Sequence, residues 1–265
     1  MSTNNNLFYC KTTEGYIIKS VFELLKNNIK QGCFVISNNS ISLRMTDSNN
    51  KILIDLVLLA ENFIQYKYTK SQEFFVGINI PIMYSLVREI KKKDSIALYI
   101  ENDNLTDLYV SIIPKDGVAI TTGKIKIQNF QSVEIETPSL ALYSNPKILH
   151  SNAYGKIIKS LSGNVGGNII TVSSTLSNIQ FIGSSNGICS RNVLISNDII
   201  VDEKEDGNKI IQEFETEQLI RISKISSLST QLQCYQKDEL PLFIKTNIGN
   251  LGVLKIFLKD KSQYE

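Results

Sequence analysis

The stretch Gly15-Tyr16-Ile17-Ile18-Lys19-Ser20-Val21-Phe22 has a near copy later in the chain, Gly155-Lys156-Ile157-Ile158-Lys159-Ser160-Leu161. A second pair of copies follows, since Glu73-Phe74-Phe75 and Gln212-Glu213-Phe214 each precede another amphipathic segment. The paired copies lie roughly 140 residues apart, a spacing typical of an internal duplication. The sequence therefore predicts two similar domains, each large enough for its own core.

The composition is that of a globular protein. The chain has 265 residues, of which 42% are hydrophobic and 20% charged. No apolar run approaches the roughly 20 residues that span a bilayer. The start of the chain, Met1-Ser2-Thr3-Asn4-Asn5-Asn6, lacks the basic residues and apolar segment of a secretory signal. We therefore expect a protein that stays inside a cell and has no membrane partner.

The sequence contains little that supports metal binding or catalysis. His150 is the only histidine, and Gly163 to Gly167 is rich in glycine but lacks the Gly-Lys-Ser/Thr ending of a phosphate-binding loop. The cysteines form no Cys-x-x-Cys pair and are Cys10, Cys33, Cys189 and Cys234. This pattern disfavours a zinc site and a histidine-assisted nucleophile. We expect no cofactor, no metal and no enzyme activity.

Most of the chain alternates apolar and polar residues over short segments that are separated by Asn, Ser, Asp and Gly. Examples are Cys33 to Ser37, Ser40 to Met45, Ile52 to Leu59 and Ser95 to Glu101. This pattern is typical of antiparallel strands. With two helices expected in each half, the fold class is α+β, with helices packed on one face of the sheets.

Four segments follow a helical period instead: Gly15 to Lys30, Ile80 to Lys92, Asn152 to Leu161 and Glu217 to Ser226. Asn79 is expected to cap the second helix, with Pro81 in its first turn. All four helices carry cations opposite the apolar face. These cations are Lys19, Lys26, Lys30, Arg88, Lys91, Lys92, Lys156, Lys159, Arg221 and Lys224.

A single lysine pair on a helix commonly marks only a solvated face. Four basic helices in two repeats, with few acidic residues, instead favour a surface that binds a polyanion. If the helices line up, the cations form one stripe whose natural partner is phosphate. Acidic residues gather elsewhere, in the segment from Asp198 to Asp206. The sequence contains no base-reading motif, so we expect phosphate contacts that do not depend on the DNA sequence.

A connector separates the two halves. Its apolar residues Ile135, Leu140, Leu142 and Tyr143 are unusual for a solvated linker, so we expect it to pack on a surface and to form part of a groove. The predicted domains are an N-terminal domain over residues 1–128, a connector over 129–146 and a C-terminal domain over 147–265.

Several anchors resemble the proliferating cell nuclear antigen family of DNA sliding clamps, in order along essentially the whole chain. Leu240 to Thr246 with Leu251 to Leu258 resembles the last two strands of the family. Ile41 to Ser48 is similar to its strand that ends in a Met-Asp-Ser turn, and Gly77-Ile78-Asn79-Ile80 is similar to the start of its second helix.

The resemblance implies a DNA-clamp fold, in which three subunits close head to tail into a ring around duplex DNA. It implies a non-enzymatic processivity factor that is placed on DNA by a clamp loader and tethers DNA polymerase and other replication and repair proteins. The expected location is the nucleus, or a cytoplasmic replication site if the protein is viral. The implied subunit interface residues are Val118, Ile125, Ile127, Arg191, Val193 and Ile195.

The resemblance also assigns site residues. The DNA-facing positions of the family fall on Lys19, Lys26, Arg88, Lys156 and Lys159, and Arg221 and Lys224 are the best candidates on the fourth helix. The implied pocket for partner peptides is lined by Thr46, Ile135, Leu140, Leu142, Tyr143, Pro241, Phe257 and Leu258. Thr46 replaces a methionine of the family, which implies an altered peptide specificity.

The main alternative is a clamp-fold scaffold that does not act as a processivity clamp, such as a checkpoint-type subunit of a hetero-ring or a viral accessory factor. An unrelated α+β enzyme is a weaker alternative. Oligomeric mass and primer extension on a circular template separate these hypotheses.

Overall fold

A computed structural model describes residues 5–130, 135–143, 145–162, 167–185, 188–196 and 209–264. The glycine-rich segment at 163–166 and the acidic segment at 198–206 lie outside the described residues. The chain divides into two compact units. Unit 1 comprises Met1–Met45, Ile54–Ile135 and Asn247–Leu254, and unit 2 comprises Thr46–Leu53, Glu136–Thr246 and Lys255–Glu265. The linear division at residues 128 and 146 stays a prediction.

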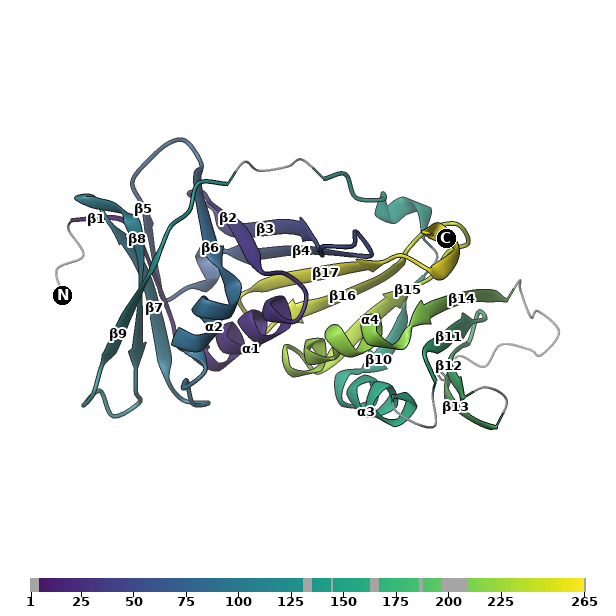
Figure 1. Ribbon diagram of the computed structural model, residues 1–265. Coiled ribbons are helices and arrows are strands. Elements are labelled where there is room, and N and C mark those ends of the chain that lie inside the picture. The colour runs from purple at the N-terminus through teal and green to yellow at the C-terminus, as the bar shows by residue number, and fades with distance from the viewer. Residues whose placement is uncertain are drawn as a thin grey trace. The chain divides into compact units, whose positions relative to one another are not determined.

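The N-terminal half of the chain alternates strands with two helices (Figure 1). Its sheets have the strand orders β5-β1-β7-β8-β9 and β4-β3-β2-β6, and the paired strands are antiparallel. The elements are β1 (Asn6–Thr12), α1 (Gly15–Lys26), β2 (Gln31–Ile36), β3 (Ser40–Thr46), β4 (Ile52–Leu59), η2 (Ala60–Asn62), β5 (Gln65–Tyr68), β6 (Phe74–Asn79), α2 (Ile80–Val87), β7 (Ser95–Glu101), β8 (Asn104–Ile113) and β9 (Thr121–Lys126).

The C-terminal half repeats this plan with one strand fewer. Its strand orders are β13-β12-β11-β14 and β10-β15-β16-β17. The elements are η3 (Leu140–Leu142), β10 (Lys147–His150), α3 (Ser151–Leu161), β11 (Ile169–Ser174), β12 (Asn178–Ser185), β13 (Cys189–Ser196), β14 (Ile210–Glu215), α4 (Thr216–Arg221), η4 (Ser223–Ser227), β15 (Gln231–Tyr235), β16 (Leu242–Ile248), β17 (Gly252–Leu258) and η5 (Lys261–Gln263).

The order of the elements confirms the predicted duplication. Each half contains two runs of five elements. The run β1-α1-β2-β3-β4 matches β10-α3-β11-β12-β13, and the run β6-α2-β7-β8-β9 matches β14-α4-β15-β16-β17, while β5 has no counterpart. The pairing agrees as well, because β4-β3-β2-β6 corresponds to β13-β12-β11-β14 and β1-β7-β8-β9 corresponds to β10-β15-β16-β17. Each strand therefore has an equivalent in the other half, apart from β5.

Three of the four helices end earlier than predicted, for local reasons. Helix α1 ends at Lys26, and the side chain of Asn28 donates a hydrogen bond to the Leu24 carbonyl at 2.8 Å. Helix α2 ends at Val87, and in the turn that follows the Asp94 carboxylate accepts a hydrogen bond from the Lys91 N–H at 2.9 Å. Helix α4 ends at Arg221, and the rest of the segment forms the 3-10 turn η4.

The start of α2 is as predicted. The side-chain oxygen of Asn79 accepts a hydrogen bond from the Ile82 N–H at 3.0 Å, and Pro81 lies in the first turn, where no helical N–H is lost. The apolar face predicted for α1 is also confirmed, because Ile18, Val21 and Leu25 are buried. Burying this face leaves the lysines of α1 at the surface.

Tyr154 on α3 is fully buried, and its hydroxyl has no hydrogen-bond partner among the described residues. An unpaired buried hydroxyl costs about 1 kcal/mol or more. We expect Tyr154→Phe to raise the free energy of unfolding by about 1 kcal/mol, as measured by urea denaturation. The matched control is Tyr143→Phe, which removes a hydroxyl that donates to the Pro241 carbonyl at 2.8 Å and should lower this free energy. A loss of stability in both variants would contradict the prediction.

Candidate nucleic-acid interface

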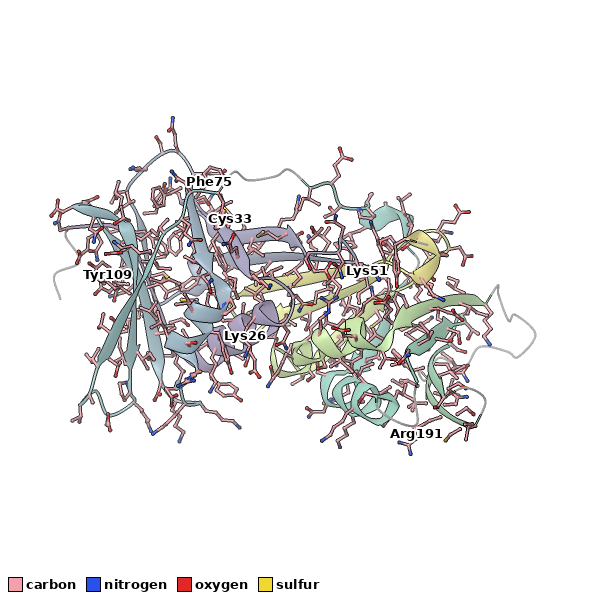
Figure 2. The ribbon with its side chains drawn as sticks, viewed as in Figure 1. Lys26, Cys33, Lys51, Phe75, Tyr109 and Arg191 are labelled. Carbon is pink, nitrogen blue, oxygen red and sulfur yellow. The ribbon has the colours of Figure 1, made fainter. Side chains whose placement is uncertain are left out.

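The lysines of α1 lie on the side of the helix that meets α2. The Lys26 ammonium lies 4.3 Å from the ring centroid of Tyr84 on α2, a cation–π contact. Figure 2 labels Lys26. The Lys19 ammonium donates a hydrogen bond to the Ile90 carbonyl at 3.1 Å, just past the end of α2. Lys26 remains exposed and Lys19 is half-buried. Both lysines therefore belong to one surface formed by α1 and α2.

The other predicted cations of unit 1 lie just beyond the helix ends and are exposed. Lys30 follows α1, and its carbonyl accepts the Ile80 N–H at 2.9 Å, which brings it to the start of α2. Arg88 pairs with Glu89 at 3.1 Å, but both side chains are exposed, so the pair is weak and Arg88 remains able to bind phosphate. Lys91 and Lys92 lie in the turn after α2, not on the helix as predicted.

In unit 2 three of the predicted cations lie on two elements that pack together. Lys156 and Lys159 are exposed on α3, which contacts η4. The approach is close at Gly155, where a Cβ atom would lie 3.1 Å from the Ser226 hydroxyl. Lys224 lies on η4 and is half-buried. The structure therefore gathers these three lysines on neighbouring elements.

Arg221 differs from the other predicted DNA contacts. Its guanidinium donates a hydrogen bond to the Asp47 carboxylate at 2.8 Å. The Arg221 side chain is 20% exposed and the Asp47 side chain is 0% exposed. A buried carboxylate needs this cation nearby, since an unpaired buried charge is strongly unfavourable. The structure therefore gives Arg221 an ion-pair partner within unit 2, and its contact to DNA phosphate stays a prediction.

The predicted subunit interface falls on strands β9 and β13, which lie at sheet edges in the part of the chain that the structure describes (Figure 1). Val118 precedes β9 and is 83% exposed. Ile127 follows β9, and its N–H donates to the Thr106 carbonyl at 2.8 Å. Arg191 is exposed and donates a hydrogen bond to the Ser160 carbonyl at 3.3 Å.

Three of the predicted interface side chains point into their own sheet instead. Ile125 is buried within unit 1. Val193 and Ile195 pair in register with the buried residues Phe181 and Ile179 and so share the core face of that sheet. Ile125 is therefore closed off by its own unit, whereas Val193 and Ile195 remain half-buried, and their place in a subunit interface stays a prediction.

The sequence reasoning missed the exposed apolar residues at the edge of β13. Leu194 is 59% exposed and Ile188, just before the strand, is 89% exposed. The alternation of side chains along a strand was the available signal, since Val193 and Ile195 on the core face place Leu194 on the opposite face.

Strand β9 is fixed to its neighbour by a cluster of charges. The buried carboxylate of Asp107 on β8 lies 3.1 Å from the Lys124 ammonium and 2.8 Å from the Lys126 ammonium, both on β9. Hydrogen bonds from Lys126 and Asn104 hold the pKa of Asp107 well below its usual range. The cluster therefore contributes to holding the edge strand in register.

The predicted partner pocket contains an aromatic cluster in unit 2. The Tyr143 ring lies 5.6 Å from the Phe243 ring, and Phe243 stacks on Phe257 at 4.7 Å between ring centroids. The Tyr143 hydroxyl bonds the Pro241 carbonyl, which ties the connector to the start of β16. Tyr143 and Pro241 are half-buried and accessible.

Other predicted pocket residues are placed differently. Phe257 and Leu258 are buried, so they do not form an accessible floor. Leu140 and Leu142 are exposed on η3, as a contact surface requires. The carbonyl of Ile135, in unit 1, accepts a hydrogen bond from Arg44 at 3.4 Å.

Thr46 belongs to unit 2, where its hydroxyl bonds the Asn50 side chain at 2.8 Å.

No helix within the described ranges is long and apolar enough to cross a membrane. Those same residues contain no group of three His, Cys, Asp or Glu side chains that could hold a metal ion.

Comparison with known proteins identifies the relatives of this chain. Residues 7–132 match the family model of the proliferating cell nuclear antigen N-terminal domain, and residues 141–261 match that of its C-terminal domain. The chain is 25% identical over 268 residues to "Probable DNA polymerase sliding clamp 1" of Paramecium bursaria Chlorella virus 1. The aligned region covers 97% of this chain and 98% of that protein.

The fold has a close structural counterpart. The crystal structure of proliferating cellular nuclear antigen from Entamoeba histolytica matches with a TM-score of 0.82 at 18% identity, over 97% of this chain and 99% of that chain. The duplicated strand order, the basic helices and these matches define a two-domain DNA-clamp fold. The chain belongs to the proliferating cell nuclear antigen family.

The Asp107 cluster predicts an acid-sensitive contribution to stability. The pKa of Asp107 in the folded protein lies below its value of about 3.9 in the unfolded chain. The ionised carboxylate therefore contributes its full stabilisation above the unfolded pKa, and this stabilisation is lost as the pH falls from there toward the folded pKa. Asp107→Asn should therefore lower the free energy of unfolding at neutral pH, and its difference from the wild type should shrink between about pH 5 and pH 2.

Urea denaturation over this pH range measures the difference. Asp238→Asn, which changes an exposed aspartate in a turn of unit 2, is the control and should show no comparable trend. A difference between Asp107→Asn and the wild type that does not vary with pH would exclude the proposed role of the charge cluster.

Proposed function

We propose that this protein is a DNA sliding clamp that closes into a homotrimeric ring around duplex DNA and tethers a DNA polymerase. It acts by enclosing DNA, not by catalysis. The observation that carries the proposal is the correspondence between the strand edges of the two halves, together with membership of the family.

The two edge strands are the counterparts of a pair that already exists within the chain. Strand β17 lies beside β4, and the approach is close, because a Cβ atom on Gly252 would lie 1.9 Å from the Val57 carbonyl oxygen. By the correspondence of the halves, β17 is equivalent to β9 and β4 is equivalent to β13. Strand β9 of one copy can therefore pair with β13 of the next in the same manner.

Such a contact joins two different surfaces, so it repeats head to tail and forms a finite assembly only if it closes into a ring. Closure would also protect the edge strands from aggregation, since unpaired strand edges invite pairing with other chains. Three subunits are the number that the family resemblance implies.

The positions of the cations support DNA as the enclosed partner. The lysines on and near α1, α2, α3 and η4 are suited to phosphate contacts, which position a duplex without reading its sequence. The printed name of the viral relative includes "DNA polymerase sliding clamp", which favours a polymerase as the tethered protein. The exposed Leu140 and Leu142, with Tyr143 and Pro241, form the proposed docking surface for peptides of polymerase, clamp loader and other replication proteins.

The protein would work where DNA is replicated, in the nucleus or, for a virus, at a cytoplasmic replication site.

Primer extension on a singly primed circular template, with a cognate loader and polymerase, tests the function. The wild type should have a mass by light scattering of three times 29.8 kDa and should lengthen the products. Leu194→Asp places a charge on the edge strand β13 and should give monomers that do not lengthen them. The control is Leu176→Asp, because Leu176 is similarly exposed, at 55%, but lies outside the strands.

A wild-type trimer that left product length unchanged would favour a clamp-fold scaffold. A wild-type monomer at micromolar concentration would exclude a ring that closes by itself.

Charge reversal tests the DNA-facing surface. Lys26→Glu combined with Lys159→Glu should weaken binding to a short duplex and lower the slope of log affinity against log salt by about 1 for each phosphate that the protein no longer binds. Fluorescence anisotropy measures the slope, and light scattering checks that the trimer is intact. Lys70→Glu combined with Lys237→Glu, at exposed positions outside the helices, is the control. A slope that the first pair leaves unchanged would show that these helices do not face DNA.

A further inference from the structure

The turn between β3 and β4 is tied to α4 at both ends of that helix. Asp47, at the start of the turn, pairs with Arg221 at the C-terminal end of α4, with 2.8 Å between the oxygen and the nitrogen. Lys51, at the end of the turn, pairs with Glu215, the N-cap of α4, at 2.6 Å. The two ion pairs therefore fix the turn to α4 at two separate points.

Asp47 also organises the turn itself. One oxygen of its carboxylate accepts hydrogen bonds from the Lys51 N–H at 2.8 Å and from the Ile52 N–H at 3.0 Å. The other oxygen accepts the hydrogen bond from Arg221. A carboxylate can stay ionised and buried when it is satisfied in this way. Arg221 thus supports the charge on which the conformation of the turn depends.

The same turn carries residues next to the predicted partner surface. The Thr46 hydroxyl bonds the side chain of Asn50, which has a φ of 55°, and the Lys51 carbonyl accepts the Lys259 N–H at 2.9 Å just after β17. The Lys51 ammonium also lies 3.9 Å from the centroid of the Tyr264 ring. A shift of the turn would therefore move Thr46 and the C-terminal segment together.

We propose that Arg221 is a positioning residue for the partner-peptide surface, which it holds in place through Asp47, and not a contact to DNA phosphate. This inference rests on the proposed function, in that the surface at Thr46 receives a peptide of a replication protein. The Arg221 guanidinium pairs with a carboxylate that has 0% exposure, and loss of this cation would leave a buried charge without its partner, which is strongly unfavourable. Lys156 and Lys159 are exposed, and neither pairs with a buried acid among the residues that the structure describes.

Three measurements on the intact protein test the inference. Fluorescence anisotropy with a labelled synthetic peptide that carries the clamp-binding motif of a replicative polymerase reports on the partner surface. The salt dependence of binding to a short duplex reports on phosphate contacts. Hydrogen exchange at the Lys51 and Ile52 amides, which bond Asp47, reports on the turn without any partner.

Arg221→Gln should weaken peptide binding about tenfold and speed exchange at both amides, while the salt slope of DNA binding stays unchanged. Arg221→Lys keeps a cation near Asp47 and should restore much of the peptide affinity. The control Lys156→Gln should lower the salt slope and leave the peptide affinity and both amides unchanged. In an Asp47→Asn background, Arg221→Gln should change peptide affinity less than about twofold, since the charge that it supports is absent.

The double variant also guards against failure to fold, because it removes both charges of the pair and leaves no buried ion. A salt slope lowered by Arg221→Gln, with both amides still protected, would assign Arg221 to DNA and overturn the inference. An equal effect of Arg221→Gln with and without Asp47 would overturn it as well. If the wild type failed to bind the peptide, the proposed partner surface would be wrong, and hydrogen exchange would still decide whether Arg221 positions the turn.

Discussion

Backbone hydrogen bonding at strand edges is the constraint on which this structure depends. An edge strand presents a row of N–H and C=O groups that must be paired, solvated or shielded. Within the chain, β17 lies beside β4. Duplication produces the same two edges a second time, as β9 and β13, and a single chain leaves both at sheet edges. The strand order that builds each half therefore also creates the two edges through which the proposed ring would close.

The arrangement of charge follows from the packing of the helices. Because the apolar face of α1 is buried, its lysines must lie at the surface, and α3 repeats this outcome with Lys156 and Lys159. Arg221 lies on an equally amphipathic helix but serves a buried carboxylate. Cations that look alike in the sequence therefore divide into those that can bind a ligand and those that hold the protein together.

Local features were predictable, and features that depend on distant residues were not. Asn79 and Pro81 predict the start of α2, because capping involves residues only three positions apart. The turn after α2 contains an equally local contact, from the Lys91 N–H to the Asp94 carboxylate, which could have been recognised. By contrast, Arg221 and Asp47 are 174 positions apart, so no helical pattern shows their pairing. The burial of Phe257 likewise depends on Phe243 and Tyr143, which come from a neighbouring strand and the connector.

Closure of the proposed ring through backbone pairing would have a consequence for which subunits can join it. Main-chain hydrogen bonds are nearly the same whatever the side chains, so β9 would accept the β13 edge of a related clamp almost as readily as that of its own kind. A cell that held two such proteins would assemble mixed rings unless side chains discriminated against them. Lys124 and Lys126 on β9, and Arg191 and Leu194 on β13, lie where a mismatched charge or an unfilled apolar contact would reject a foreign subunit. Lys124 and Lys126 also pair with the buried Asp107, so the exposed Arg191 and Leu194 have more freedom to diverge, and such changes would let paralogous clamps share a compartment while each keeps its own partners.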